Sequence, residues 1–237
     1  GNIPVHAFNL ISPTFFANSS TGNKYSLWVN VYGVSERYLN VYGEKDLRAQ
    51  MNQFFHRTYT HPVDGTTLDM KMLCNWYWYD ETAILETGKG TKDWNFYRYA
   101  ETLLSAAEAI AQSSGVNAEA AGYLAQVKAR ANMEGKTVAA ITADLQKLGK
   151  QAFIEECWTE RLREFPLEMK IWDDCVRTGK FPQISATNKG EVQFVDLIGA
   201  KNGSGATFKA TDLYWPIPVN EIQRNPNLTQ NEGYSAK

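Results

Sequence analysis

The sequence predicts a mainly α-helical protein in which long irregular loops and short strands adjoin a helical core. Between residues 93 and 180, apolar residues recur every three or four positions, which is the helical period. Residues 1–92 and 181–237 instead hold short β-branched and aromatic runs broken by glycine, proline and polar residues. We therefore interpret residues 1–237 as a single region with three parts: 1–92, 93–180 and 181–237.

Two consecutive helices are expected at the start of the helical part. Residues 98–113 carry leucines and alanines at helical spacing, and no glycine or proline interrupts them before Gly115. Asn117 is a suitable N-cap for a second helix over residues 117–131. Because few residues join the two helices, they should form an antiparallel hairpin. Alanines on both helices would let the axes approach closely, as in TPR-like repeats.

The same periodicity predicts further helices. A third is expected over residues 142–165, where Pro166 interrupts the pattern, and a fourth over residues 167–177, before Gly179. Residues 46–55 are the best helical segment of the first part. Further TPR-like repeats are expected upstream of Gly1, because one hairpin is not a solenoid.

The last part of the chain predicts loops and an extended strap. Residues 183–212 are rich in glycine, serine, threonine, asparagine and lysine, which is typical of an exposed loop or a ragged hairpin. Residues 213–234 contain three prolines and should form a strap across the helices, with Trp215 and Ile217 largely buried.

Charge and hydropathy restrict the classes of function. Lysine and arginine total 24 and aspartate and glutamate total 26, so the net charge is −2 and no broad basic face is available for nucleic acid. The sequence has no apolar stretch of the roughly 20 residues that a spanning helix needs. It opens with Gly1, so we expect the native amino terminus, with any export signal or lipid anchor, to lie upstream.

Several sequence blocks together resemble the SusD/RagB family. The most specific is Tyr-Trp-Pro-Ile-Pro-Val-Asn-Glu at 214–221 followed by Asn-Pro-Asn-Leu-Thr-Gln-Asn-Glu-Gly-Tyr at 225–234. The other blocks lie at 42–48, 98–104, 107–109, 127–131 and 160–165. The chain is therefore similar to the carboxy-terminal half of the family. Met169, Ile171 and Cys175 depart from the pattern, since they occupy positions where the family usually has glycine, arginine and leucine.

This resemblance implies a SusD-like fold and a non-catalytic protein of nutrient uptake. It implies carbohydrate binding in starch or polysaccharide utilization, at the outward-facing cell surface of the outer membrane. The partners implied are an oligosaccharide and a SusC-like transporter for TonB-dependent transport. The full-length protein would be a lipoprotein, anchored through the missing amino-terminal part. The alternative is a peptide-capturing or structural lid subunit of such a transporter.

An aromatic segment at residues 75–80 is the strongest candidate for ligand binding. Asn75, Trp76, Tyr77 and Trp78 combine flat rings that stack on sugar C–H faces with an amide that bonds hydroxyls. In a strand, Trp76 and Trp78 would share one face and Tyr77 and Tyr79 the other. The alternative is that these aromatics are packing residues. Trp28 and Tyr32 are further candidates for ligand binding.

The remaining reactive residues favour structural roles. His56 and His61 have no third ligand nearby and do not have helical ligand spacing, so no metal site is expected. Asp173 and Asp174 are adjacent on a helix and cannot face each other across a glycosidic bond. No nucleophile or phosphate-binding motif occurs, so neither catalytic residues nor a cofactor is expected.

Charged and thiol groups on the predicted helices are also interpreted as scaffold. Residues of this kind at helical spacings favour ion pairs between helices. They are Arg98, Glu101, Glu160, Arg161 and Glu164. Antiparallel helices could bring Cys157 and Cys175 side by side, but buried free thiols are the favoured interpretation.

Overall fold

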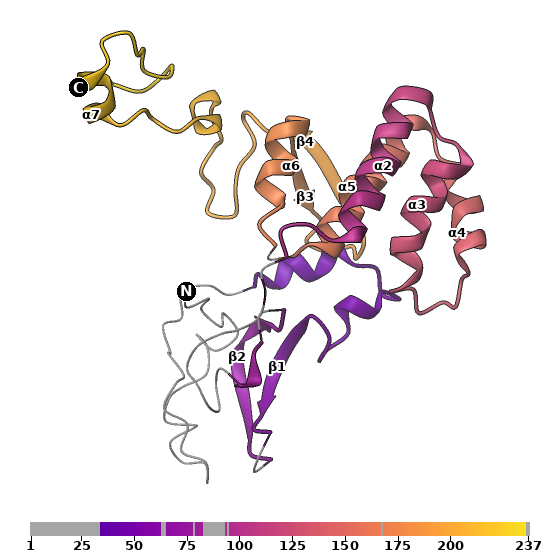
Figure 1. The fold of residues 1–237 in the computed structure, drawn as a ribbon. Coiled ribbons are helices and arrows are strands. Elements are labelled where there is room, and N and C mark those ends of the chain that lie inside the picture. The colour runs from indigo at the N-terminus through magenta and orange to yellow at the C-terminus, as the bar shows by residue number, and fades with distance from the viewer. Residues whose placement is uncertain are drawn as a thin grey trace. The chain divides into compact units, whose positions relative to one another are not determined.

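The computed structural model describes residues 34–62, 65–77, 79–82, 93, 95–166 and 168–235. Helices dominate these residues, and the strands are short, which confirms the predicted mainly α-helical class (Figure 1). Trp28, Tyr32 and Trp78 lie outside the described residues.

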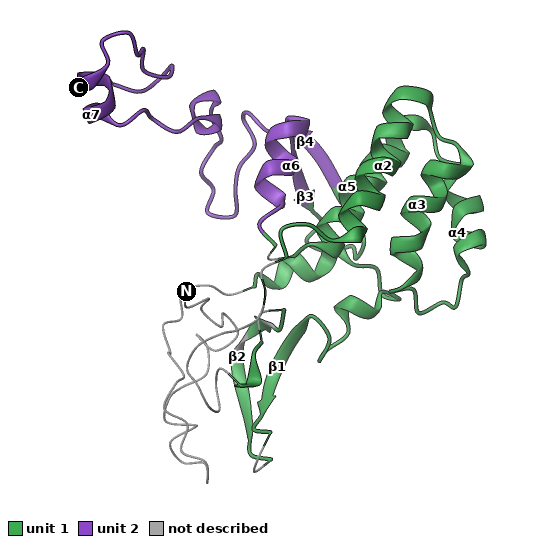
Figure 2. Cartoon of the chain, viewed as in Figure 1, with its two compact units in different colours: residues 1–168, 184–192 green, residues 169–183, 193–237 purple. Residues whose placement is uncertain are grey.

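Contacts along the chain define two compact units (Figure 2). Unit 1 comprises residues 1–168 and 184–192, and unit 2 comprises residues 169–183 and 193–237. The aromatic segment and residues 93–168 of the helical part belong to unit 1, whereas residues 169–180 belong to unit 2. The division into three parts made from the sequence remains an interpretation.

The predicted helical hairpin is present in unit 1. Helix α2 spans Tyr99–Ser114 and ends at Gly115, whose φ of +83° suits glycine. Helix α3 spans Ala118–Ala129, and the Asn117 side chain accepts a hydrogen bond of 2.9 Å from the Ala120 amide, as its predicted capping role requires. Helices α2 and α3 pack together through fully buried alanines. These are Ala107, Ala111, Ala120, Ala121 and Ala125.

The single third helix predicted over residues 142–165 is wrong. The chain forms α4 (Val138–Leu145) and α5 (Lys150–Glu164), and Gly149, in an extended conformation, caps the second of them. Helix α4 packs on α3, whereas α5 packs on α2. Because both helices bury apolar residues, the apolar period continues across the turn and does not reveal it.

The helix predicted over residues 46–55 is also wrong. A 3-10 turn, η3 (Leu47–Ala49), follows Asp46, whose side chain accepts from the Arg48 amide. Asn52 then has a φ of +65°, and Phe55, which is fully buried, begins a strand. Local side-chain bonding and the pairing of Phe55 therefore outweigh the weak helical pattern.

Two strands of unit 1 form the hairpin that carries the aromatic segment. Strand β1 (Phe55–Thr60) pairs antiparallel with β2 (Thr67–Asn75). His56 lies opposite Cys74, and an irregularity in register follows between His56 and Thr58. A second 3-10 helix of unit 1, η2 (Glu36–Val41), precedes the hairpin, and the hydroxyl of Tyr38 within it donates to the Leu162 carbonyl at 2.6 Å.

Helix α6 (Ile171–Thr178) opens unit 2 and ends as predicted at Gly179, whose φ is +66°. Strands β3 (Lys180–Ile184) and β4 (Val192–Asp196) form a two-stranded sheet. The predicted hairpin is therefore present only at the start of residues 183–212, and its first strand begins earlier, at Lys180. Next come a 3-10 helix, η5 (Ala210–Leu213), and a short helix, α7 (Val219–Arg224).

The expectation that the strap buries Trp215 is wrong, since this side chain is 89% exposed, and Ile217 is half-buried. The polar residues of the strap bind its own backbone. The Gln230 side chain accepts from the Ile217 amide at 2.8 Å and donates to its carbonyl at 2.9 Å. The Asn231 side chain donates to the Trp215 carbonyl at 2.7 Å. The side chains of Gln230 and Asn231 therefore hydrogen-bond to the backbone of the strap itself, and the Trp215 indole remains exposed to solvent.

Candidate functional site

The predicted aromatic segment forms a turn and not a strand. Strand β2 ends at Asn75, the Trp76 amide donates to the Phe54 carbonyl at 2.8 Å, and the Tyr79 amide donates to the Trp76 carbonyl at 3.1 Å. This turn brings Tyr79 back over Trp76. The predicted alternation, with Trp76 and Tyr79 on opposite faces, is therefore wrong.

Three rings stack at the end of the hairpin. The Trp76 ring lies 4.0 Å from His56 and 4.9 Å from Tyr79 between centroids, and each pair is within 14° of parallel. Tyr59 of β1 contacts both Trp76 and Tyr79 in tilted geometry. Trp76 is half-buried, so the indole both supports the neighbouring rings and remains accessible.

A cavity of about 240 Å³ lies against this stack. Its lining combines aromatic rings with hydroxyl, amide, imidazole and carboxylate groups. The lining residues are Asn52, His56, Thr58, Tyr59, Thr60, Pro62, Trp76, Tyr79 and Glu81. The Tyr79 hydroxyl donates to Glu81 Oε2 at 3.1 Å, which ties a ring to the carboxylate. This mixture of flat apolar faces and polar edges is what a sugar ring requires.

The pKa values of two rings of this cavity are shifted in the direction that favours their uncharged forms. Burial lowers the pKa of His56 below its ordinary value of 6.5. Burial, and then the neighbouring Tyr59 and Glu81, raise the pKa of Tyr79 well above its usual range. Among the described residues that line the cavity there is no lysine or arginine, so Glu81 sets the sign of the local charge.

The structure places Tyr77 apart from this cavity. Tyr77 lines a different cavity, of about 390 Å³, together with Arg98 and Glu164. Burial and Glu168 raise the pKa of Tyr77. Asn75 ends β2 opposite Phe55.

Sequence reasoning missed the contribution of β1 to the site. His56, Thr58 and Thr60 reach the cavity from β1, and Asn52 from the turn before it. The sequence does indicate a strand there, because β-branched and aromatic residues are frequent at residues 55–60. Assigning that strand would have placed His56 beside the end of β2.

The predicted ion pairs between helices are present in unit 1. Arg98 donates to Glu164 at 2.9 Å and to both oxygens of Glu168 at 2.9 and 2.7 Å. Arg161 lies 3.4 Å from Glu101. Both glutamates that bind Arg98 are buried, with side chains 4% exposed. Their contacts support the interpretation of these motifs as scaffold.

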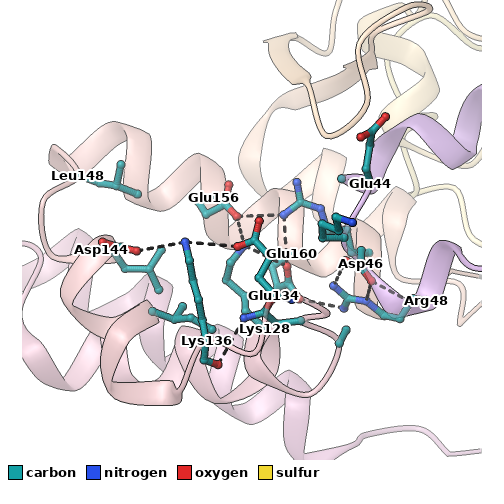
Figure 3. Close-up of a pocket in the computed structure, with 17 residues that line it drawn as sticks. Glu44, Asp46, Arg48, Lys128, Glu134, Lys136, Asp144, Leu148, Glu156 and Glu160 are labelled. Carbon is teal, nitrogen blue, oxygen red and sulfur yellow. Dashed lines mark hydrogen bonds and ion pairs between the residues drawn. The ribbon is translucent and has the colours of Figure 1, made fainter.

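A larger cavity, of about 610 Å³, has charged walls (Figure 3). Glu160 is fully buried in its wall, 2.9 Å from Arg48 and 3.4 Å from Arg163. Burial opposes ionisation of Glu160, but the charges of Arg48, Lys128 and Arg163 outweigh it and lower the pKa to about 2. Lys136 lies 3.5 Å from Asp144 at the rim. These charges bind one another, so the cavity is polar without presenting one dominant sign.

Three further features of the described residues concern metal ligands, disulfides and membrane spans. No group of three or more histidine, cysteine, aspartate or glutamate residues is placed to hold a metal ion within the ranges given above. Cys74, Cys157 and Cys175 are free and buried, as favoured from the sequence. In the same part of the chain, every helix is too short or too polar to cross a membrane.

The described residues thus combine a helical scaffold with a polar and aromatic cavity on a hairpin. The SusD family model matches residues 19–234, so the chain belongs to the SusD family. This family consists of binding proteins and not enzymes, in agreement with the non-catalytic role predicted from the sequence.

Two relatives illustrate the likeness. The chain is 36% identical over 138 residues to the starch-binding protein SusD of Bacteroides thetaiotaomicron, an alignment that covers 58% of this chain and 21% of that protein. A crystal structure of a SusD superfamily protein from Parabacteroides distasonis matches with a TM-score of 0.75 and 29% identity. That match covers 96% of this chain and 46% of the other. The chain thus spans less than half the length of these relatives.

Proposed function

We propose that this protein binds glycans without transforming them and delivers them to a SusC-like TonB-dependent transporter. Membership of the SusD family and the likeness to a starch-binding protein support this proposal. The same likeness supports a place on the outward-facing surface of the outer membrane, with the full-length protein held by a lipid anchor. Binding would be the whole contribution of this subunit, and the transporter would supply the work.

The observation that carries the proposal is the ring stack beside the hairpin cavity. His56, Trp76 and Tyr79 are held in nearly parallel planes, so the site is preorganised before a ligand arrives. Thr58 and Thr60 add hydroxyl groups to the cavity. Sugar rings bind where aromatic faces and hydrogen-bonding side chains meet in this way.

The proposal predicts that Trp76→Ala weakens glycan binding by the full-length protein about tenfold to a hundredfold. The reason is that stacking of a planar ring on an aromatic platform contributes on the order of 1 to 3 kcal/mol. Isothermal titration calorimetry against a panel of neutral oligosaccharides measures this loss, after circular dichroism has shown that the variant folds. The matched control is Trp215→Ala, which removes an exposed indole in unit 2.

Two outcomes would contradict the placement of the site. Unchanged affinity in Trp76→Ala would show that binding lies elsewhere in the full-length protein. An equal loss in Trp215→Ala would show that the effect is not specific to the hairpin. Tyr79→Ala provides a second measurement, because it removes a ring of the same stack while leaving Trp76 in place.

A peptide-capturing lid is the second candidate function. The observation in its favour is the cavity of about 610 Å³, whose walls carry both cationic and anionic side chains that could meet the two termini of a peptide. Its charges are already paired with one another, so a peptide would have to displace internal ion pairs. Titration of the same protein with short peptides that have free termini tests this alternative, and binding of peptides with no binding of glycans would favour it.

A further inference from the structure

We infer that the hairpin cavity accepts one uncharged pyranose unit and discriminates against sugars that carry a carboxylate or sulfate. This inference rests on the proposed glycan-binding function and specifies which glycans the site takes. Three properties of the cavity support it: its size, the chemistry of its polar groups and the sign of its charge.

The size suits a single sugar unit. The cavity of about 240 Å³ is smaller than the roughly 300 to 1,000 Å³ typical of pockets for drug-sized ligands. One ring with its hydroxyl groups can enter it, whereas the rest of an oligosaccharide would extend outside. The exposed residues at its edge, Asn52, Thr58 and Thr60, leave a path for such an extension.

The polar groups of the cavity match hydroxyl groups. Threonine hydroxyls and the Asn52 amide can each both donate and accept, as sugar hydroxyls do. Burial lowers the pKa of His56 below its ordinary value, so this stacked ring adds no fixed positive charge to the cavity. The cavity therefore offers both donors and acceptors to a ligand, as sugar hydroxyls require, and not donors alone.

The charge of the cavity disfavours anions. Proteins recognise carboxylate and sulfate groups with arginine or lysine, and neither occurs among the described residues of the lining. Arg57, the basic residue of β1, donates to both oxygens of Glu36, at 2.8 and 2.6 Å. Glu81 adds a carboxylate that would face an anionic ligand. A charged sugar would thus lose hydration and meet a like charge without a compensating cation.

The expected discrimination is modest because Glu81 is exposed to solvent. Two like charges a few ångströms apart in water repel enough to change an affinity about fivefold. We therefore expect a preference of about fivefold for a neutral sugar over its carboxylate counterpart at moderate salt. The preference should decrease as the ionic strength is raised, because salt screens exposed charges.

The test compares matched pairs of oligosaccharides on the full-length protein. Maltohexaose, cellohexaose and a β-linked galactohexaose are each titrated beside a counterpart whose primary hydroxyls have been oxidised to carboxylates. We expect each neutral oligosaccharide that binds to do so about fivefold more tightly than its counterpart. Glu81→Gln should reduce the preference about fivefold, measured as the ratio of the two affinities within the same variant.

A charge-matched control separates the local effect from the net charge of the protein. Glu119→Gln removes an exposed carboxylate on α3 that is hydrogen-bonded to Tyr123, and it should leave the preference unchanged. Equal or tighter binding of the oxidised counterparts to the wild-type protein would overturn the inference while leaving glycan binding intact. A preference that Glu81→Gln does not reduce would overturn it as well. If no oligosaccharide of either kind binds, the proposed glycan function itself fails, and this inference fails with it.

Discussion

Met169 occupies a backbone conformation that favours glycine. Its φ is +60°, in the left-handed region, and its side chain is 67% exposed, so burial does not compensate for the strain. The SusD/RagB pattern has glycine at this position. The departure noted in the sequence thus has a structural cost. The left-handed backbone at residue 169 interrupts the helix predicted from residue 167, so α6 begins at Ile171.

Met169→Gly is therefore expected to raise the free energy of unfolding by about 0.5 to 1 kcal/mol. Relief of left-handed strain contributes about 1 to 2 kcal/mol, and the greater freedom of glycine in the unfolded chain subtracts part of it. Urea denaturation measures the difference. Met133→Gly is the control, since Met133 is also exposed but does not have a positive φ, and this change should destabilise the protein. A loss of stability in Met169→Gly would contradict the argument from strain.

At the scale of elements, α5 organises unit 1 through its charged residues. Glu164, near its end, accepts from Arg48 at 3.0 Å, from Arg98 at 2.9 Å and from Arg130. Arg48 precedes β1, Arg98 precedes α2, and Arg130 follows α3. A single buried carboxylate therefore connects three segments that are distant in the sequence.

Glu164→Ala should lower the free energy of unfolding by about 1 to 3 kcal/mol, because three arginines each lose one charged hydrogen-bond partner. The loss is limited because Arg48 keeps Asp46 and Glu160, and Arg98 keeps Glu168. Chemical denaturation followed by far-ultraviolet circular dichroism measures the loss. The control is Glu155→Ala on the same helix, where the carboxylate accepts only from Gln151 among the bonds described for that side chain. That variant should change stability by less than about 1 kcal/mol. Similar losses in the two variants would show that Glu164 has no special role.

The elements also show which features a sequence reveals. The α2–α3 hairpin was predictable because its apolar period, its cap at Asn117 and its terminal Gly115 all agree. The break at Gly149 was not, because apolar residues keep the helical period on both sides of it. Trp76 was predicted as a site residue from composition. Its stacking partner His56 was not, because strand register and the turn at 76–79 bring the rings together.

At the scale of the whole molecule, the two units differ in how densely they are packed. The described core residues of unit 1 include many fully buried side chains, among them Leu104, Leu124 and Phe153. By contrast, large apolar side chains of unit 2 are exposed, including Tyr214 at 58% and Trp215 at 89%. Local stability follows burial, so the units should not open with the same free energy.

Hydrogen exchange followed by mass spectrometry should therefore show the slowest exchange in α5 and fast exchange over residues 201–235. Fully deuterated protein corrects for back-exchange, and the intrinsic rates of unstructured peptides provide the reference. Within the strap, the Ile217 amide should exchange more slowly than an unstructured amide, since it donates to Gln230. Protection of residues 225–235 equal to that of α5 would contradict this prediction, and would indicate that the strap is covered in solution.

The sharing of Glu164 among three arginines also has a consequence for divergence. A substitution at any one of the arginines changes the ion-pair energy of the other two with Glu164. The effect of each substitution on stability therefore depends on which residues occupy the other positions. Replacement of the carboxylate would be tolerated when the arginines have changed beforehand, and would be harmful in the reverse order. The order in which mutations arise would thus decide which descendants of this sequence still fold.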